Sequence, residues 1–365
     1  MSAAMGVIVF SILAFGPVCS GASRQGSGKV FIFRGTSDAS AAVALGKDMF
    51  IVADDENNIL RVYRMGAAMP VYSYNISGFL ETEAEHPEAD IEGATRVGSR
   101  IYWISSHGRN KDGKLRPNRY RFFATDVQIR GVNVEIRPVG KPCKILARSM
   151  LSAGGLAGLG LRRATMLSAA LSKRERERLA PKREGLNIEA LFASGHGRTI
   201  YIGFRNPRPL DRATGRRCAL VVPLENPSDV VERGARPLFG RPILWDLGGL
   251  GIRAVEYSSF HGAYFVVAGA HDASPLFAMY RWSGLESEKH QPICQLGQTN
   301  FTPETLVVFS DSERVLLLSD DGSIPVSVFG PSECIQGKLN EDGTCPNKYL
   351  LDPQKKTFRA VWFKP

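Results

Sequence analysis

Carboxylates recur at one position of a repeated sequence pattern, and a fold that superimposes the repeats would bring them to a single site. In each copy an acidic residue opens a short strand, a Gly-containing turn follows, and a second, strongly β-prone strand ends in charged residues. The acidic residues of this pattern are Asp38, Asp90, Glu92, Glu189, Glu256 and Glu304. Several carboxylates at one place repel one another, so they need a cation, interleaved arginines or raised pKa values.

Such a group of side chains could hold a metal ion. Ca²⁺ and Mg²⁺ prefer hard oxygen ligands, and the candidate ligands are Asp90, Glu92, Glu189 and Glu304. A metal ion beside arginines suits phosphoester or ester hydrolysis, because the metal activates water and the arginines hold the anion. The candidate catalytic residues are Glu92, Glu189, Glu304, Arg205, Arg109 and His107. A structural reading stays open, because acids at strand starts also cap turns or bind backbone amides.

The pattern occurs five times and predicts an all-β fold. The copies begin near Asp38, Asp90, Asn187, Ile252 and Thr302. The first and the last intervals are 52 and 50 residues long, which is about the size of one four-stranded propeller blade. We therefore predict a β-propeller of five blades over residues 29–363, closed by pairing of the strand Lys29–Phe33 with the last blade. A sixth, degenerate blade around 131–186 and a β-sandwich are the alternatives.

The propeller topology places the polar residues on one face. The start of the first strand and the end of its antiparallel neighbour lie at the same end of a blade. The first strands line the central channel, so their acids should meet at its mouth. Charged and polar residues that end the second strands should lie on the same face, and they include Asp54, Asp55, His107, Arg109, Arg205, Asn206, His271, Asp272, Asp320 and Asp321.

One segment, residues 147–184, departs from the β pattern. Its Ala, Leu and Met content and the helical spacing of Leu167–Leu179 predict one or two helices inserted in the propeller domain. The formal net charge of the chain is +10, and much of the excess lies between Leu161 and Glu184. A basic helix face is either solvated or in contact with a polyanion or a membrane surface, and both interpretations stay open.

The N-terminal residues indicate export. An apolar run from Val7 to Phe15 precedes Gly16-Pro17 and a stretch of small residues, which is typical of a signal peptide. We predict a signal peptide over residues 1–22 and a periplasmic or secreted protein. Cys334 and Cys345 flank a Gly-, Asn- and Asp-rich loop, and they are the expected disulfide in an oxidising compartment.

Three segments carry a resemblance to known families, namely Asp90–Ala94, Leu186–Leu191 and Gly203–Pro207. Through them the chain resembles, over most of residues 30–330, a bacterial family of exported propellers of unknown function. More distantly it is similar to phytase-like esterase propellers, which share a Glu-Gly-Leu-type motif at the start of the innermost strand.

The resemblance implies a propeller fold and, faintly, a hydrolase. Glu92, Glu189 and Glu304 match the motif glutamate. Gly93 keeps the motif glycine, Ala190 and Thr305 replace it, and the fourth copy, with Glu256 in the acidic position, departs further. These departures weaken the case for a symmetric metal site.

Two function classes follow from the sequence. The first is an exported propeller that binds a ligand, a metal ion or a partner at an acidic channel mouth. The second is a metal-assisted phosphoesterase or esterase that resembles the phytase-like propellers. The expected partners are a small anionic substrate, or an envelope protein or glycan at the channel face. We expect no specific nucleic-acid binding and no transmembrane segment.

Overall fold

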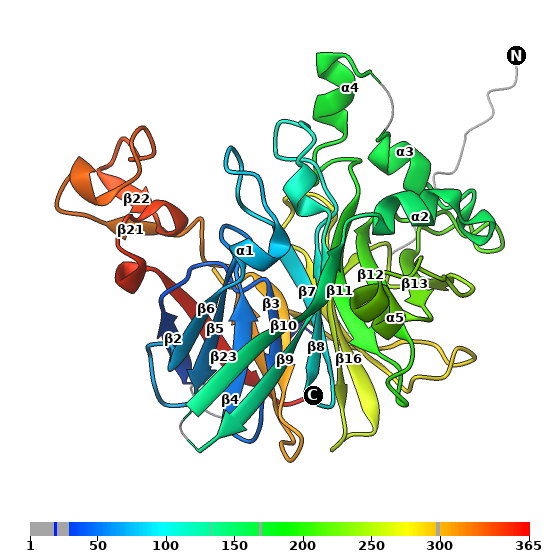
Figure 1. Ribbon diagram of the computed structural model, residues 1–365, viewed down its shortest axis with the longest axis horizontal. Helices are drawn as coiled ribbons and strands as arrows, with labels where there is room; N and C mark the ends of the chain where they lie inside the picture. Colours follow the sequence, from blue (N-terminus) through cyan, green and yellow to red (C-terminus); the bar gives the residue numbers. More distant parts are fainter. Residues whose placement is uncertain (1–17, 20–28, 132, 168–169, 297–299) are drawn as a thin grey trace, which may run out of the picture.

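The computed structural model describes residues 18–19, 29–131, 133–167, 170–296 and 300–365. Within these ranges the chain forms five antiparallel blades arranged around a common axis (Figure 1). The innermost strands form a closed ring, because β3 contacts β7, β7 contacts β11, β11 contacts β15, β15 contacts β19, and β19 contacts β3. The prediction of a five-bladed propeller is confirmed.

The first two blades each use four consecutive strands. Blade 1 contains β3 (Ala41–Ala44), β4 (Met49–Ala53), β5 (Ile59–Arg64) and β6 (Tyr72–Asn75). Blade 2 contains β7 (Ile91–Val97), β8 (Arg100–Ser105), β9 (Phe122–Arg130) and β10 (Asn133–Cys143). The alternative of a sixth blade around 131–186 is wrong, because this segment supplies the outermost strand of blade 2 and then short helices.

Blades 3 and 4 follow the same order. Blade 3 contains β11 (Asn187–Ala193), β12 (Ile200–Asn206), β13 (Ala219–Leu224) and β14 (Ile243–Trp245). Blade 4 contains β15 (Gly251–Ser258), β16 (Ala263–Gly269), β17 (Phe277–Trp282) and β18 (Gln291–Leu296). The two residues of β1 (Val18–Cys19) pair in parallel with β18. The rest of the predicted signal peptide, residues 1–22, lies outside the described residues.

Blade 5 closes the ring with strands from both ends of the chain. It contains β19 (Pro303–Val308), β20 (Val315–Ser319), β23 (Thr357–Phe363) and, outermost, β2 (Val30–Arg34). The predicted pairing of the early strand with the last blade is therefore confirmed. Phe33 and Phe358 of this blade pack with Phe50 and Tyr63 of blade 1, with ring centroids 5.2 to 5.6 Å apart. Aromatic burial of this kind holds the closing blades together.

The strands form where the sequence supplies β-branched and aromatic residues, and both blade faces are apolar because each packs on a neighbour. All five residues of β4 are buried, and so are all seven of β16. The motif glycine has a packing role, since a Cβ at Gly93 would come within 3.0 Å of the β11 backbone at Ala190 and Leu191. The missing side chain lets β7 and β11 approach closely at the channel.

Short helices and loops stand at the end of the propeller where the innermost strands begin (Figure 1). The insertion between β10 and β11 contains α2 (Leu146–Ser152), η2 (Gly154–Leu156), α3 (Leu161–Thr165) and α4 (Lys173–Arg178). Two further short helices are α1 (Ser77–Leu80) and η1 (Pro117–Arg119). The helix α5 (Pro227–Arg233) follows β13 and packs against β10. No helix in the described part of the chain has the length and apolar character needed to cross a membrane.

A separate excursion leaves blade 5 between β20 and β23. It contains the hairpin β21 (Pro325–Ser327) and β22 (Thr344–Pro346) with η3 (Pro331–Glu333), η4 (Asn347–Tyr349) and η5 (Pro353–Lys355). The predicted disulfide between Cys334 and Cys345 is present, and it closes this excursion.

Candidate functional site

Four charged residues at the channel mouth lie in a β-bulge that recurs in four of the blades. The pairing of the first two strands shifts register at Glu92, Glu189 and Glu304, and the corresponding residue of blade 4 is Arg253. Each of these four residues is the second or third residue of its innermost strand. Each lies in a β-bulge and therefore has no cross-strand partner. A bulge re-aims a side chain, so one local device places four charged groups at the mouth.

The structure corrects one residue of the predicted ring. Arg253 occupies the position that the sequence pattern assigned to Glu256. Glu256 lies three residues further along β15, in a pocket of about 280 Å³ with Arg96 and Tyr257. Three residues of strand span about 10 Å, so Glu256 belongs to the opposite end of the channel. Burial raises its pKa to about 8.

One half of the mouth is balanced by arginines, and we call Glu189, Arg205, Arg253 and Glu304 the paired half. Arg253 lies 3.1 Å from Glu189 and 2.6 Å from Glu304, and Arg205 lies 2.9 Å from Glu189. Both guanidinium groups are buried, with side-chain exposures of 5% and 4%. The charges of this half are therefore matched within the protein, and Glu189 and Glu304 need no metal ion.

Further contacts fix the paired half in place. The Asn187 amide donates a 2.6 Å hydrogen bond to Glu189, and Arg205 also donates to the backbone carbonyls of Ala270 and Asp272 at 3.0 and 2.6 Å. Burial raises the pKa of Glu304 to about 7, although the Arg253 charge opposes the shift. With its donors already committed, Arg205 is poorly placed to act as the expected anion clamp.

The other half carries an excess of carboxylates, and we call Asp38, Asp55, Glu56, Asp90 and Glu92 the acidic half. Carboxylate oxygens of Asp38, Asp55 and Glu56 lie within 4.8 Å of one another, as do those of Asp55, Asp90 and Glu92. Asp55 belongs to both groups. The sequence pattern had placed Asp90 and Glu92 among the candidate metal ligands, and the structure brings them together here.

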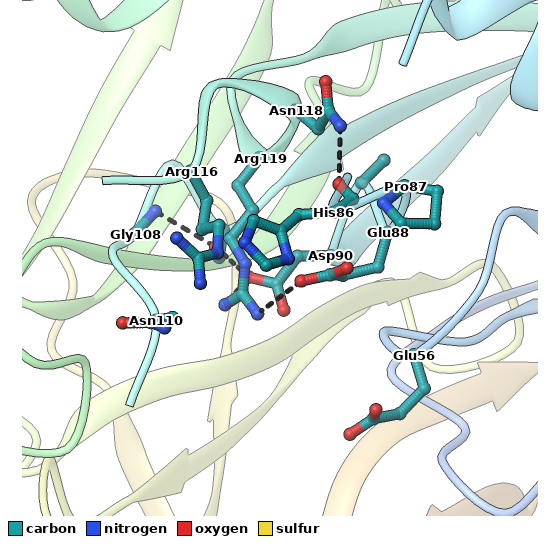
Figure 2. Close-up of polar contacts among 12 residues, drawn as sticks. Glu56, His86, Pro87, Glu88, Asp90, Gly108, Asn110, Arg116, Asn118 and Arg119 are labelled. Atoms are coloured by element: carbon teal, nitrogen blue, oxygen red, sulfur yellow. Dashed lines mark hydrogen bonds and ion pairs between the residues drawn. The ribbon is translucent and has the colours of Figure 1, made fainter. Parts of the chain in front are cut away.

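Only two members of the acidic half have cationic partners among the described residues. Figure 2 shows the Arg119 guanidinium between Asp90, at 2.9 Å, and Glu88, at 3.4 Å. Lys348 lies 2.6 Å from Glu56. The Asp90 carboxylate also accepts a hydrogen bond from the Ser106 hydroxyl. The remaining carboxylates, Asp38, Asp55 and Glu92, form no ion pair in the described part of the chain.

The electrostatics of the acidic half follow from burial and like charge. Burial raises the pKa of Asp38, Asp55 and Glu92 well above the ordinary values, and neighbouring carboxylates raise it further. Asp38 also shares a hydrogen bond with Asp320, which raises the pKa of Asp38 and lowers that of Asp320. The Asp55 Oδ1 atom is buried and accepts no hydrogen bond.

Hard carboxylate oxygens that face one another in this way fit a divalent cation. Ca²⁺ takes six to eight oxygen ligands and Mg²⁺ six, and the remaining positions could be filled by water, since Asp55, Glu56 and Glu92 are partly exposed. A cation would also give the unpartnered Asp55 Oδ1 atom a ligand role. No nitrogen or sulfur ligand lies in either of the two groups, so the donor set favours a hard cation over zinc.

Two of the predicted catalytic residues lie away from both halves. His107 is fully buried at a positive φ of 53°, its Nδ1 atom faces the Ser105 carbonyl at 2.8 Å, and its ring packs edge-on against Tyr120. Burial lowers the pKa of His107 to about 4. A neutral, enclosed imidazole without access to the mouth is a packing residue, and we leave His107 out of the site.

Arg109 has a structural position as well. Its guanidinium donates to the carbonyls of Gly113, Thr165 and Met166 at 3.1 to 3.3 Å. These bonds tie the loop after β8 to the end of α3. Because its two terminal nitrogens are occupied by backbone carbonyls and the side chain is buried, Arg109 is poorly placed to act as an anion clamp at the mouth.

Sequence reasoning missed Arg119 and Lys348, the two cations of the acidic half. Arg119 ends η1 in the loop between β8 and β9, and Lys348 lies in the disulfide-closed excursion. Neither residue falls at a repeated position. Only the folded arrangement brings them to the carboxylates.

The fold and the site define a five-bladed β-propeller with a carboxylate-rich channel mouth. Residues 38–121 match a family described as "Protein of unknown function (DUF3616)", and this segment contains the whole acidic half. The expected likeness to a propeller family of unknown function is confirmed for that segment. No curated protein matches the chain.

Solved structures resemble the chain at low identity. The glutaminyl cyclase of Myxococcus xanthus is 10% identical with a TM-score of 0.41, over 79% of this chain and 88% of that one. An oxidoreductase from Thermus thermophilus, described as a glucose dehydrogenase, is 11% identical with a TM-score of 0.42, over 92% and 100%. At these values the similarities carry no argument about function.

Proposed function

We propose that this protein is an exported β-propeller that binds a hard divalent cation, Ca²⁺ or Mg²⁺, at the acidic half of its channel mouth. The bound cation would present its open coordination positions to an anionic ligand or to a partner at this face. The arrangement of Asp38, Asp55 and Glu92 supports the proposal, because carboxylate oxygens of Asp38 and of Glu92 each lie within 4.8 Å of Asp55 and none of the three residues has a cationic partner in the described chain. A buried Asp55 oxygen without a hydrogen bond is the observation that carries it.

The paired half argues for the same assignment by contrast. There the chain balances its buried carboxylates with arginines at 2.6 to 3.1 Å. In the acidic half the same chain leaves carboxylates unbalanced, at a cost that a cation would offset. Our proposal therefore moves the metal site from the symmetric set of Asp90, Glu92, Glu189 and Glu304 to one side of the mouth.

A metal titration of chelator-treated protein tests the proposal. At constant ionic strength, CaCl₂ or MgCl₂ should raise the melting temperature in a saturable way, because a ligand that binds only the folded state stabilises it. Asp55→Asn should abolish the response. Glu288→Gln is the matched control, because it removes an exposed carboxylate from the loop at the far end of blade 4. A response to NaCl of equal size, or an unchanged response in Asp55→Asn, would contradict the proposal.

A second candidate function is metal-assisted hydrolysis of a phosphoester or ester, as the likeness to phytase-like propellers implies. The specific observation in its favour is that the two carboxylate groups share Asp55, because hydrolytic sites often hold two metal ions between bridging carboxylates. Turnover of p-nitrophenyl phosphate or p-nitrophenyl acetate that needs the divalent cation and is lost in Glu92→Gln would support it. Cation binding without turnover would leave the binding function alone.

Export belongs to the same proposal. The apolar run over Val7–Phe15 and the Cys334–Cys345 disulfide both suit an oxidising compartment outside the cytoplasm. Mass spectrometry of the protein recovered from its native host should find a mature N-terminus close to residue 23. Recovery of the full-length chain from the cytoplasm would contradict export.

A further inference from the structure

A second cavity on this end of the molecule has the opposite charge to the acidic half. It has a volume of about 440 Å³ and lies between the insertion and the loops that follow β12 and β16. Its charged lining residues are Arg163, Arg183, Arg208, Arg217 and Glu184, with His271 beside them. Four arginines thus share the cavity lining with one carboxylate, and like charges brought together are unfavourable unless they are balanced.

The single carboxylate is already engaged elsewhere. Glu184 lies 3.0 Å from Arg163 and 3.6 Å from Arg178. Arg183, Arg208 and Arg217 form no ion pair with any described carboxylate. The positive charge of this cavity is therefore left unbalanced by the described part of the chain.

Arg208 is the least exposed of the four arginines that line this cavity. One of its terminal nitrogens donates to the Gly249 carbonyl, and its own carbonyl accepts a 3.2 Å hydrogen bond from Arg217. Its Nε atom is buried and has no hydrogen-bond partner. A half-buried guanidinium with an unused donor, beside a second arginine, is a preformed recognition group for an oxyanion.

The insertion forms one wall of the cavity. Gly158, Leu159 and Gly160 line it, and a Cβ at Gly160 would come within 3.3 Å of the Pro207 side chain. The φ of +82° at Gly160 is open to glycine and rarely to other residues. The basic insertion therefore packs directly against the loop that carries Arg208, and its charge contributes to a defined cavity as well as to a solvated helix face.

We propose that this cavity is a binding site for a phosphate group, either free phosphate or the phosphate of a small ester. The site is separate from the acidic half and does not depend on a divalent cation. Phosphate fits because it carries close to two negative charges near neutral pH and accepts several charge-assisted hydrogen bonds. The volume of about 440 Å³ falls in the range of small-molecule sites, and it leaves room beyond one phosphate group.

Calorimetry with inorganic phosphate in the presence of a chelator tests the site without any contribution from a bound metal. We expect saturable binding and a higher melting temperature in phosphate than in chloride at equal ionic strength. Arg208→Gln should weaken binding at least tenfold, since one charge-assisted hydrogen-bonding group is lost. Arg198→Gln is the control, because Arg198 is an exposed arginine in the hairpin at the opposite end of blade 3.

Arg217→Gln keeps the test decisive if the Arg208 variant fails to fold. Arg217 is exposed at the rim, so its replacement should leave the fold intact and weaken phosphate binding several-fold. Equal binding of phosphate by the wild type and by both folded variants would overturn the proposal. So would a melting temperature that does not distinguish phosphate from chloride.

Two further measurements locate the ligand and name its source. Burial and the nearby Arg208 lower the pKa of His271, and a bound dianion should raise it again, as a proton NMR titration of the imidazole would record. An unchanged His271 titration with phosphate bound would place the ion elsewhere and overturn the assignment.

Tighter binding of glucose 6-phosphate than of inorganic phosphate assigns the cavity to a phosphate ester, and the reverse order assigns it to the free ion.

Discussion

The two halves of the channel mouth differ in how the charges of their carboxylates are balanced. Both bring carboxylates together at the channel mouth. In the paired half, Arg253 and Arg205 sit within 3.1 Å of Glu189, and Arg253 also reaches Glu304. In the acidic half, Asp55 and Glu92 have no such partner among the described residues.

The contrast between the two halves indicates which of them is suited to an external cation. A buried ion pair that is complete costs little, whereas a buried charge without a partner costs several kcal/mol or shifts its pKa. Arg253 stands at the bulge position where blades 2, 3 and 5 carry glutamate. Arg253 at this position, together with Arg205 of β12, thus distinguishes a structural half of the ring from a half suited to a cation.

The largest expected effect comes from breaking the paired half. Arg253→Met would leave Glu189 and Glu304 buried without their shared cation, at a cost of about 3–5 kcal/mol in unfolding free energy. Urea denaturation measures this change. Arg233→Gln is the control, because it breaks an exposed i,i+4 pair with Asp229 that is worth less than about 0.5 kcal/mol. Similar losses in the two variants would refute the distinction between buried and exposed pairs drawn here.

The pH dependence of stability should come next in size. Burial raises the pKa of Asp54 to about 6 and that of Glu304 to about 7. The pKa values of these two carboxyl groups in the folded state lie above their values of about 4 in the unfolded state. Their contribution to stability is therefore complete below pH 4 and is lost as the pH rises through 6 to 7. In chelator, we expect a loss on the order of 2 kcal/mol between pH 5 and pH 8.

Divalent cations should offset part of that loss at high pH, because a cation bound at the acidic half stabilises the folded state more strongly once carboxylates such as Asp55 and Glu92 are ionised. Melting curves at several pH values, with chelator and with CaCl₂, provide the measurement. Identical pH profiles under the two conditions would contradict a cation site at the acidic half.

Removing one carboxylate from the acidic half should stabilise the protein when no metal is present. Asp55→Asn keeps the shape of the side chain and removes a charge that burial and its neighbours disfavour. At pH 8 in chelator we expect a gain of about 1 kcal/mol in unfolding free energy. Glu288→Gln should change stability by less than about 0.5 kcal/mol. Destabilisation by Asp55→Asn under these conditions would mean that Asp55 has a structural partner.

The sequence predicted the propeller and its closure because repetition is visible along a chain. Alternating strands, their spacing and the early strand Val30–Arg34 all identify blades. The repeat also located Glu92, Glu189 and Glu304, since each lies just inside its first strand. It failed in blade 4, where the pattern of acids favoured Glu256 and only the register shift at Arg253 identifies the equivalent residue.

The balance of charge could not be predicted in the same way. Arg119 and Lys348 come from loops that differ between blades, and a loop's path follows from tertiary contacts that no repeat encodes. His107 and Arg109 carry the residue types of an active site, yet their side chains are taken up by packing and by backbone carbonyls. Residue type and position in the motif predicted which face of the propeller carries the charged residues. Only the side-chain contacts of the folded structure distinguished the paired half from the acidic half.

The smallest expected effect concerns Lys348, a cation at the edge of the acidic half. Lys348 is paired with the Asp38, Asp55 and Glu56 group through Glu56, at 2.6 Å. Lys348→Gln should cost at most about 1 kcal/mol, since the side chains of this pair are 30% and 38% exposed. The same change frees the Glu56 carboxylate and removes a positive charge that competes with a bound cation.

Calcium affinity measured by calorimetry should therefore rise about two- to threefold in Lys348→Gln. Lys355→Gln is the matched control, because Lys355 pairs with Glu333 in the same excursion and neither residue belongs to the acidic half. An unchanged affinity in both variants would place the cation in the Asp55, Asp90 and Glu92 group, away from Glu56. A lower affinity in Lys348→Gln alone would show that the excursion positions Glu56 for the ion, and that the ion pair supports the site.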